Sequence, residues 1–358
     1  THDREFQIGM QLLRAMISGE EAGAALSDVA DATLRGLLPH VEAEFQRAHG
    51  EMPGGEFVIV GLGKLGGREM TFSSDLDVIF IYRGSAAEQT QSEGPRPLPL
   101  SQYYGRLSQR LVTAVSALTP EGKLYEIDAR LRPSGQSSPL ASEAGGFAEY
   151  QNNSAWSWEH MALTRARVIA GSPALGEHVK GIIRAVLAKP RADAALVGEV
   201  AGMRERIDKK RRTENHWKLK HVRGGLLDIE FIAQYLQLRE ASRHPEILSQ
   251  ETDKVFERLS TAGIMAADDA ADLAEVARLM RRLQALLRLT VGVSRDEAQY
   301  PTGVRQALAK AAGVENFDDV RVRLMKSEET VRAYYARYVQ QPADAGNADK
   351  SKFEDANL

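Results

Sequence analysis

The sequence predicts an α+β fold, in which a small α/β unit lies between a helical N-terminal segment and a larger helical region. Short, continuous apolar runs at residues 57–60 and 76–82 are typical of buried strands. In residues 266–291, apolar side chains recur at i, i+3, i+4 and i+7, which predicts an amphipathic helix. At 358 residues the chain exceeds the usual size of one domain, so we expect more than one packed unit.

Four segments follow from these patterns. Residues 4–49 have helical spacing, and Gly50 with the Pro-Gly run after it predicts the end of this helical segment. A polar loop at 84–99, a helix from Ser101 to about 118 and a third strand at 123–131 complete the α/β unit. We therefore expect a helical segment at 1–50, an α/β domain at 51–172, a helical bundle at 173–340 and a polar, disordered tail at 341–358.

The composition narrows the classes of function. There is no cysteine, which excludes disulfides, thiolate zinc sites and cysteine nucleophiles and fits a cytoplasmic protein. No window approaches 18 uncharged apolar residues, and a net charge of −3 gives little general attraction to nucleic acid. We therefore expect neither a membrane nor a nucleic acid as partner. The charged N-terminus has no signal-peptide core, and its lack of an initiator Met fits a fragment of a longer chain.

Gly61, Gly63 and Gly66 form a G-x-G-x-x-G string, which raises the possibility of dinucleotide binding. That fold needs a full helix and a second strand ending in an acidic residue about 20 residues on. Here only eight residues separate Gly66 from Asp75, and Asp75 begins a strand. A Walker A loop is excluded as well, because no G-K-[ST] follows. What remains is a glycine pair, Gly66-Gly67, that either shapes a turn or serves the two aspartates beyond it.

Asp75 and Asp77 are candidates for a metal site. Residues i and i+2 of a strand project to one face, roughly 6.5–7 Å apart at Cα. Two carboxylates held together repel each other unless a cation lies between them. Mg²⁺, which binds a few carboxylates together with phosphate oxygens, is the favoured ion, with Mn²⁺ as the alternative. The competing interpretation is a solvated pair at the start of a strand.

The predicted third strand adds further polar side chains. Its alternation places Tyr125 and Ile127 on one face, and the polar residues Glu126, Asp128, Arg130 and Arg132 on the other. Asp128 makes a third carboxylate, and arginine binds phosphates with bidentate geometry. An exposed edge strand would show a similar alternation. Taken with Asp75 and Asp77, the pattern favours phosphoryl or nucleotidyl transfer over a scaffold.

Other signals are weaker. Residues 204–223 hold nine Lys or Arg against three acidic residues, which indicates either a solvated helix face or a surface for an acidic ligand. Arg165 and Arg167 are expected on a helix, where residues two apart diverge. Trp156 and Trp158 are expected to pack at a domain junction. Asp228 follows a Gly-Gly pair at a predicted helix start, where an acid interacts favourably with the helix dipole.

Four blocks of the sequence resemble the bacterial glutamine synthetase adenylyltransferase/adenylyl-removing enzymes, in that family's order. They are GLGKLGGREMTFSSDLDVIF, YEIDARLRPSG, WSWEHMALTRARV and RGGLLDIEFIAQYLQL, which with the intervening helices cover roughly residues 1–340. The D-x-D pattern alone would indicate only the wider DNA polymerase β-like nucleotidyltransferase superfamily. The resemblance implies a small polymerase β-like nucleotidyltransferase domain with a mixed sheet, between an N-terminal helical segment and a C-terminal helical bundle.

Enzymes of this family carry two related halves joined by a regulatory region. One half adds AMP to a tyrosine of glutamine synthetase, which lowers its activity in nitrogen regulation, and the other removes AMP by phosphorolysis to give ADP. This chain has one set of motifs and therefore resembles one half. Ser134 and Asp228 favour the adenylylating C-terminal half, because the removing half more typically has F-G after R-L-R-P and I-R-E-V-E-F after Gly-Gly. The removing half is the alternative.

The resemblance also implies roles for single residues. Asp75 and Asp77 match the metal-binding pair, and Asp128 matches the third carboxylate, as proton acceptor or ligand of a second metal. The candidates for nucleotide binding are Lys64, Gly66, Gly67, Ser74, Arg130 and Arg132. The implied reaction is attack of a tyrosine hydroxyl on the α-phosphorus of ATP, with pyrophosphate leaving.

The implied partners are glutamine synthetase and, through the full-length enzyme, a PII-type signal protein. More distant alternatives are an aminoglycoside or RNA-end nucleotidyltransferase and a catalytically silent regulatory module. The presence of Asp75, Asp77 and Asp128 argues against a catalytically silent module. The net charge of −3 argues against an enzyme that acts on RNA.

Overall fold

A computed structural model describes residues 1–85, 91–292 and 296–346 of the chain. It is α+β, which confirms the predicted fold class. The chain folds into two compact units. The first comprises Thr1–Ile8 and Ala24–Val186, and the second Gly9–Gly23 and Leu187–Leu358. This division differs from the four segments expected from the sequence, which remain a prediction.

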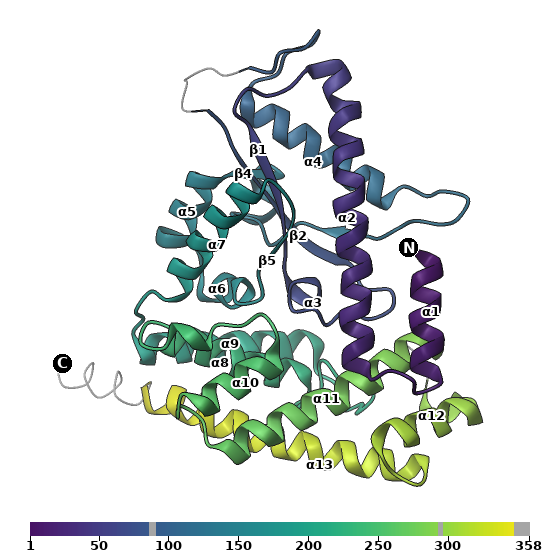
Figure 1. Ribbon diagram of the computed structural model, residues 1–358. Helices are drawn as coiled ribbons and strands as arrows, with labels where there is room; N and C mark the ends of the chain where they lie inside the picture. Colours follow the sequence, from purple (N-terminus) through teal and green to yellow (C-terminus); the bar gives the residue numbers. More distant parts are fainter. Residues whose placement is uncertain (86–90, 293–295, 347–358) are drawn as a thin grey trace, which may run out of the picture. The chain divides into compact units, whose positions relative to one another are not determined.

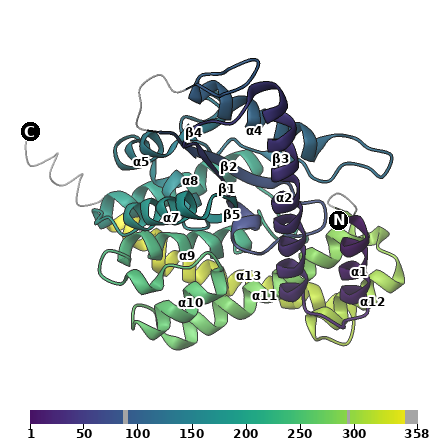
Figure 2. The ribbon, with the colours of Figure 1, turned by 45° about the horizontal axis from the view of Figure 1, so that its top comes forward.

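The first unit contains the whole sheet and the helices around it. Its strands are β1 (Glu56–Gly61), β2 (Leu76–Arg83), β3 (Ile127–Asp128), β4 (Ala141–Glu143) and β5 (Arg167–Gly171). Its helices are α3 (Gly63–Gly66), α4 (Leu100–Ser116), α5 (Ala144–Asn153), α6 (Ser157–Leu163) and α7 (Pro173–Leu187), the short 3-10 helix η1 (Gly135–Ser137), and parts of α1 (His2–Leu13) and α2 (Gly19–His49). Figures 1 and 2 both show α2 on one side of the sheet and α5 and α7 on the other.

The sheet is mixed, with β1 at its centre. The strand order is β3-β2-β1-β5, and β4 also pairs with β2. β1 is antiparallel to both β2 and β5, whereas β3 and β4 run parallel to β2 near its two ends. The β2 strand therefore carries β3 at its start, beside Leu76 and Asp77, and β4 farther along.

The two central strands form because their apolar residues are buried on both faces. Val58, Ile59 and Val60 of β1 have no exposed surface. One face is covered by α4, where Tyr104 stacks on Phe57 of β1 and on Tyr82 of β2. Both strands predicted from the sequence are therefore confirmed, within a residue at each end.

The second unit is helical. It contains α8 (Asp193–Arg211), α9 (Leu226–Glu240), α10 (Thr252–Thr261), α11 (Ala267–Thr290), α12 (Thr302–Ala312) and α13 (Phe317–Tyr335), the 3-10 helices η2 (Pro245–Ile247) and η3 (Glu297–Gln299), and the π-helical segment η4 (Ala336–Gln340). Its core lies where α11 packs against α9, α10 and α13, and fully buried Leu273, Leu283 and Leu324 belong to it. The helix predicted at 266–291 is confirmed.

Three expectations need correction. The third strand is only Ile127–Asp128, because the chain turns directly after Asp128. Arg167 begins strand β5, where a helix was expected. Trp156 and Trp158 are exposed, so they are not core residues of a junction.

The predicted loop and tail lie partly outside the described residues. Within the 84–99 loop, residues 86–90 are not described, and residues 347–358 of the tail are likewise outside. Residues 341–346 continue as helix, contrary to the expected disorder. None of the helices in the described part of the chain combines the length and apolar character that a membrane span requires.

Candidate active site

The carboxylates lie where the parallel strands β2 and β3 meet. Asp77 of β2 is the register partner of Asp128 of β3, and the Leu76 amide donates a hydrogen bond of 2.9 Å to the Glu126 carbonyl. Asp75 stands just before β2 and is exposed. Because the pairing is parallel and in register, two acidic residues that are 51 positions apart become neighbours on adjacent strands.

Asp128 is held by the loop that follows it. Its carboxylate accepts hydrogen bonds from the backbone amide of Arg130 and from the Arg130 guanidinium, with Nε 2.9 Å from both oxygens. The Arg130 side chain is 70% exposed and that of Asp128 18%. Hydrogen bonding to Arg130 lowers the pKa of Asp128 below its usual value, so this carboxylate is anionic near neutral pH.

The donor set suits a hard divalent cation, because Mg²⁺ prefers carboxylate oxygens. Within the described ranges, however, no group of three or more His, Cys, Asp or Glu is already arranged to hold a metal ion. Asp77 and Asp128 are register neighbours, Asp75 is exposed just before β2, and Asp128 is paired with Arg130.

The turn after β1 contacts Asp77 directly. Leu62 donates a backbone hydrogen bond of 2.8 Å to the Asp77 carbonyl. Gly63 has φ +51°, and a Cβ at this position would lie 2.2 Å from Oδ2 of Asp77. Only glycine therefore lets the backbone approach this carboxylate so closely. The sequence signal for this contact is the first part of the glycine string, whereas our prediction centred on Gly66 and Gly67.

Lys64 and Ser74 meet at Thr71. The Lys64 ammonium donates to Oγ1 of Thr71 at 3.0 Å, and the Thr71 and Ser74 hydroxyls are 2.8 Å apart. The Thr71 amide also donates to the Ser74 hydroxyl at 3.1 Å. These contacts join α3 to the segment before Asp75, so the two predicted nucleotide-binding residues belong to one cluster.

Gly66 and Gly67 make room for Arg165. A Cβ on Gly66 would lie 1.8 Å from the Arg165 carbonyl oxygen, and one on Gly67 would lie 2.1 Å from its guanidinium. Arg165 is buried and forms an ion pair with Glu69. The glycine pair is therefore needed for close packing against a segment about 100 residues later in the chain.

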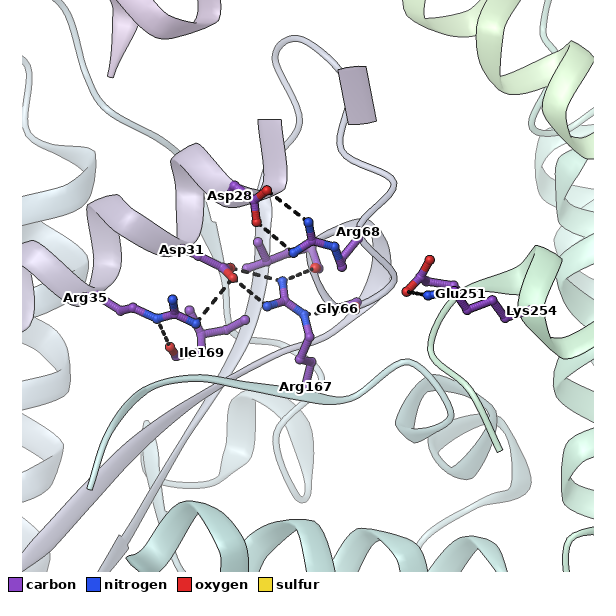
Figure 3. A network of polar contacts seen from close by, with 10 residues as sticks. Asp28, Asp31, Arg35, Gly66, Arg68, Arg167, Ile169, Glu251 and Lys254 are labelled. Atoms are coloured by element: carbon purple, nitrogen blue, oxygen red, sulfur yellow. Dashed lines mark hydrogen bonds and ion pairs between the residues drawn. The ribbon is translucent and has the colours of Figure 1, made fainter. Parts of the chain in front are cut away.

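Arg167 holds the same turn from beside Arg165. It lies between Asp31 of α2 and the Gly66 carbonyl, as Figure 3 shows. It also donates a hydrogen bond to the Leu65 carbonyl. Arg68, just beyond the turn, pairs with Asp28 of the same helix at 2.7 and 3.0 Å. Sequence reasoning missed these two arginine contacts with α2, because nothing local connects residues so far apart.

The Arg132 side chain forms hydrogen bonds within the loop that carries it. Its guanidinium donates to the backbone carbonyls of Ala129 at 2.8 Å, Pro139 at 3.1 Å and Ser138 at 3.2 Å. These bonds close the loop between β3 and β4. The structure therefore places Arg130 at the carboxylates and Arg132 in the framework of the loop behind them.

In the second unit, Asp228 is a buried partner of Arg204. Both side chains are 1% exposed, and Asp228 also accepts a hydrogen bond of 2.6 Å from the Gly224 amide. Arg204 is the first residue of the basic 204–223 segment, so that segment is not uniformly a solvated face. Asp228 does lie in the first turn of α9, as the sequence predicted.

The similarity to known proteins covers nearly the whole chain. The family model for glutamate-ammonia ligase adenylyltransferase matches residues 1–182, and the model for GlnD PII-uridylyltransferase matches residues 198–340. The chain is 40% identical over 337 residues to a bifunctional glutamine synthetase adenylyltransferase/adenylyl-removing enzyme of Xanthobacter autotrophicus, which is 94% of this chain and 34% of the relative. It is 39% identical over 342 residues to the protein of the same name from Bradyrhizobium diazoefficiens, again 34% of that relative's length.

The chain thus spans about a third of the length of these curated relatives. The first family model alone matches just over half of the chain and includes β1, β2, β3 and the glycine turn between the first two strands. The resemblance seen in the sequence is thereby confirmed, and the chain belongs to the glutamate-ammonia ligase adenylyltransferase family.

Proposed function

We propose that this chain is the adenylylating half of a glutamine synthetase-modifying enzyme and transfers AMP from ATP to a tyrosine hydroxyl of the synthetase, releasing pyrophosphate. The observation that carries the proposal is the register of Asp77 beside Asp128, with the Gly63 backbone against the Asp77 carboxylate. Family membership supports the same class of reaction. Adenylylation would be cytoplasmic and would lower the activity of the synthetase.

In this proposal Asp75 and Asp77 would hold a divalent cation, Mg²⁺ or Mn²⁺, with Asp128 as the third carboxylate. The cation would neutralise charge on the triphosphate and favour ionisation of the attacking phenol, whose pKa is about 10. Arg130 is exposed and already lies at Asp128. With a cation at the carboxylates, the exposed Arg130 guanidinium would be in position to bind phosphate oxygens, with the bidentate geometry that arginine allows.

The glycine turn supplies the other wall of the proposed nucleotide site. Lys64 and Ser74 meet at Thr71 close to the start of β2, so their cluster connects the turn to the carboxylates. We assign Gly66 and Gly67 to the shape of this turn and Lys64 and Ser74 to the phosphates. Arg132 supports the loop that carries Arg130.

The removing half of the family is the competing assignment, because phosphorolysis would use the same carboxylates. Ser134 after the R-L-R-P string and Asp228 after Gly-Gly favour the adenylylating half. Asp228 is buried against Arg204, so it distinguishes the halves as a residue of the fold and takes no part in the chemistry.

Regulation by a PII-type protein is a further part of the proposal. Residues 198–340 are similar to a PII-uridylyltransferase, which supports a connection between the helical unit and PII signalling in the full-length enzyme. Glutamine synthetase is the proposed substrate, as the names of the relatives suggest.

Label transfer tests the proposal. The chain is incubated with ATP labelled at the α-phosphate, Mg²⁺ and unmodified glutamine synthetase, and label on the synthetase is measured. We expect transfer by the wild type, loss of at least about 100-fold in Asp77→Asn, and unchanged transfer in Glu149→Gln, an exposed carboxylate of the same unit.

A second incubation distinguishes the adenylylating half from the removing half. Pre-adenylylated synthetase is mixed with the chain and inorganic phosphate, and ADP is measured. Phosphate-dependent ADP release without forward transfer would identify the removing half, and absence of both reactions would overturn the assignment of this chain as a competent catalyst.

A further inference from the structure

We propose that Arg167 and Asp31 form a positioning pair that fixes the glycine turn, residues 62–67, against Asp77. The inference rests on the proposed nucleotidyl transfer, because it assigns these two residues to the geometry of that site. Neither residue touches the carboxylates. They act through the backbone of the turn.

The contacts of Arg167 are divided between two elements. Its Nη1 and Nη2 lie 2.5 and 3.0 Å from the two oxygens of Asp31, on α2. On its other side, Nη2 donates to the Leu65 carbonyl at 2.9 Å and Nε to the Gly66 carbonyl at 3.2 Å. One guanidinium therefore connects α2 to the end of the glycine turn (Figure 3).

Both carbonyls lie at the end of α3, and the Leu65 carbonyl also accepts a longer hydrogen bond, of 3.3 Å, from the Arg68 amide. The last carbonyls of a helix have no partner further along it, and α3 is only four residues long. A cation near these carbonyls is also electrostatically favourable. Arg167 supplies both the donors and the charge, and its planar fork reaches Asp31 and the two carbonyls together, which a lysine ammonium cannot do.

Asp31 is itself fixed in place. Its side chain is 4% exposed, against 20% for Arg167. Nη2 of Arg35 lies 3.7 Å from Asp31, while Nε of Arg35 donates to the Ile169 carbonyl of β5 at 2.7 Å. The carboxylate that orients Arg167 is therefore buried between two arginines, one from its own helix and one from the sheet.

The turn transmits this anchoring to Asp77. The Gly66 amide donates to the Leu62 carbonyl at 2.8 Å, and the Gly67 amide donates to the Gly63 carbonyl at 3.1 Å, so the turn moves as one piece. Its first residues contact Asp77 through the Leu62 amide and the Gly63 backbone. A shift of the Gly66 carbonyl must therefore displace the backbone that lies on the Asp77 carboxylate.

A neighbouring pair on the same helix contrasts with this one. Asp28 and Arg68 make a bidentate contact, but their side chains are 61% and 31% exposed. Exposed ion pairs of this kind are screened by solvent and hold geometry weakly. The positioning role is therefore assigned to the buried pair, Asp31 with Arg167.

The test compares Arg167→Lys with Arg83→Lys. Arg83 pairs with Glu56, and these two residues are register partners at the opposite end of the same β1–β2 ladder. Both variants keep the positive charge but replace the planar guanidinium, with its several N–H donors, by an ammonium group. The readouts are the KM for ATP in label transfer, the dissociation constant of a fluorescent methylanthraniloyl-ATP without synthetase, and the thermal midpoint.

We expect Arg167→Lys and Asp31→Asn to raise the KM and the analogue's dissociation constant by about 10- to 100-fold. Arg83→Lys should leave both within about twofold of the wild type. A residue with a purely structural role would lower the active fraction, and hence the apparent kcat, without changing the KM. Equal KM values in Arg167→Lys, Arg83→Lys and the wild type would overturn the inference.

The analogue titration keeps this inference distinct from the proposed function. If the wild type binds the analogue but transfers no label, the proposed reaction fails, and the effect of Arg167→Lys on analogue binding still decides the positioning role. If the wild type does not bind the analogue at all, both are overturned.

Discussion

Replacement of Gly66 by alanine tests the reason for the glycine pair. The added Cβ would lie 1.8 Å from the Arg165 carbonyl oxygen and 2.8 Å from the Gly61 carbonyl oxygen, whereas ordinary contacts begin at 3.4 Å. Both neighbours are backbone atoms in or beside the sheet, so neither can rotate away. Overpacking of this kind costs about 1–3 kcal/mol, and we expect the upper end here.

Gly181→Ala is the matched control. Gly181 lies within α7 of the same unit and has no neighbouring atom within 4 Å of an added Cβ. There alanine should stabilise the helix by roughly 0.5–1 kcal/mol. The same chemical change is thus expected to have opposite signs at two positions.

Thermal unfolding followed by circular dichroism measures both variants. Gly66 and Gly181 both belong to the first compact unit, and for a unit of about 150–250 residues each kcal/mol shifts the midpoint by roughly 2–4 °C. We therefore expect Gly66→Ala to melt about 6–12 °C below the wild type and Gly181→Ala to melt slightly above it. A Gly66→Ala midpoint equal to or above that of the wild type would refute the close packing of Arg165 on the turn.

Two further predictions concern the helical unit. Asp228→Asn removes the fully buried anionic partner of Arg204 and leaves only the longer contact with Asp208, at 3.5 Å. It should therefore lower the free energy of unfolding by about 3 kcal/mol in urea titrations. Glu275→Gln, in an exposed pair of the same unit, should lower it by under about 1 kcal/mol, and similar losses would contradict the buried pairing. Burial and nearby cations lower the pKa of His221 from 6.5 to about 4. As the pH falls from 6.5 to 4, the imidazole is therefore protonated in the unfolded chain before it is protonated in the folded one, and the free energy of unfolding decreases. His221→Gln should flatten that decrease between pH 6.5 and 4, and an unchanged slope would show that His221 is not its source.

The sequence predicted β1 and β2 correctly because each contains a continuous run of apolar residues. β1 and β2 are runs of apolar residues buried on both faces, and such runs have few alternatives. β5 was missed because Val168, Ile169 and Ala170 are too few to separate a buried strand from a helix by periodicity. The available signal was Gly171, whose φ of +107° marks the end of the strand.

The third strand was overestimated for a different reason. Polar and apolar residues alternate from Lys123 to Arg132, but Asp128 accepts a hydrogen bond from the amide of Arg130, two residues on. Aspartate favours such local turns, and this one ends the pairing with β2. Asp128, the candidate site residue on this strand, is thus also the residue at which the strand ends.

Some residues of the candidate site can be recognised from their near neighbours in the sequence, whereas others depend on contacts with distant parts of the chain. Asp75, Asp77 and Asp128 could be proposed because strand geometry relates each carboxylate to its near neighbours in the sequence. Arg165, Arg167 and Asp31 could not be found in this way, since their contacts with the turn span about 100 residues or more.

This difference has a physical basis. A side chain that reacts or binds a cation must have a particular chemistry, and chemistry is visible in the sequence. A side chain that orients the backbone needs only donors of suitable geometry arriving from elsewhere in the fold, so many positions could in principle supply them. Arg167 was expected on a helix, diverging from Arg165, whereas β5 places it between Asp31 and the Gly66 carbonyl. The aspartates of this site can therefore be proposed from the sequence, but the support that holds the glycine turn against them requires the structure.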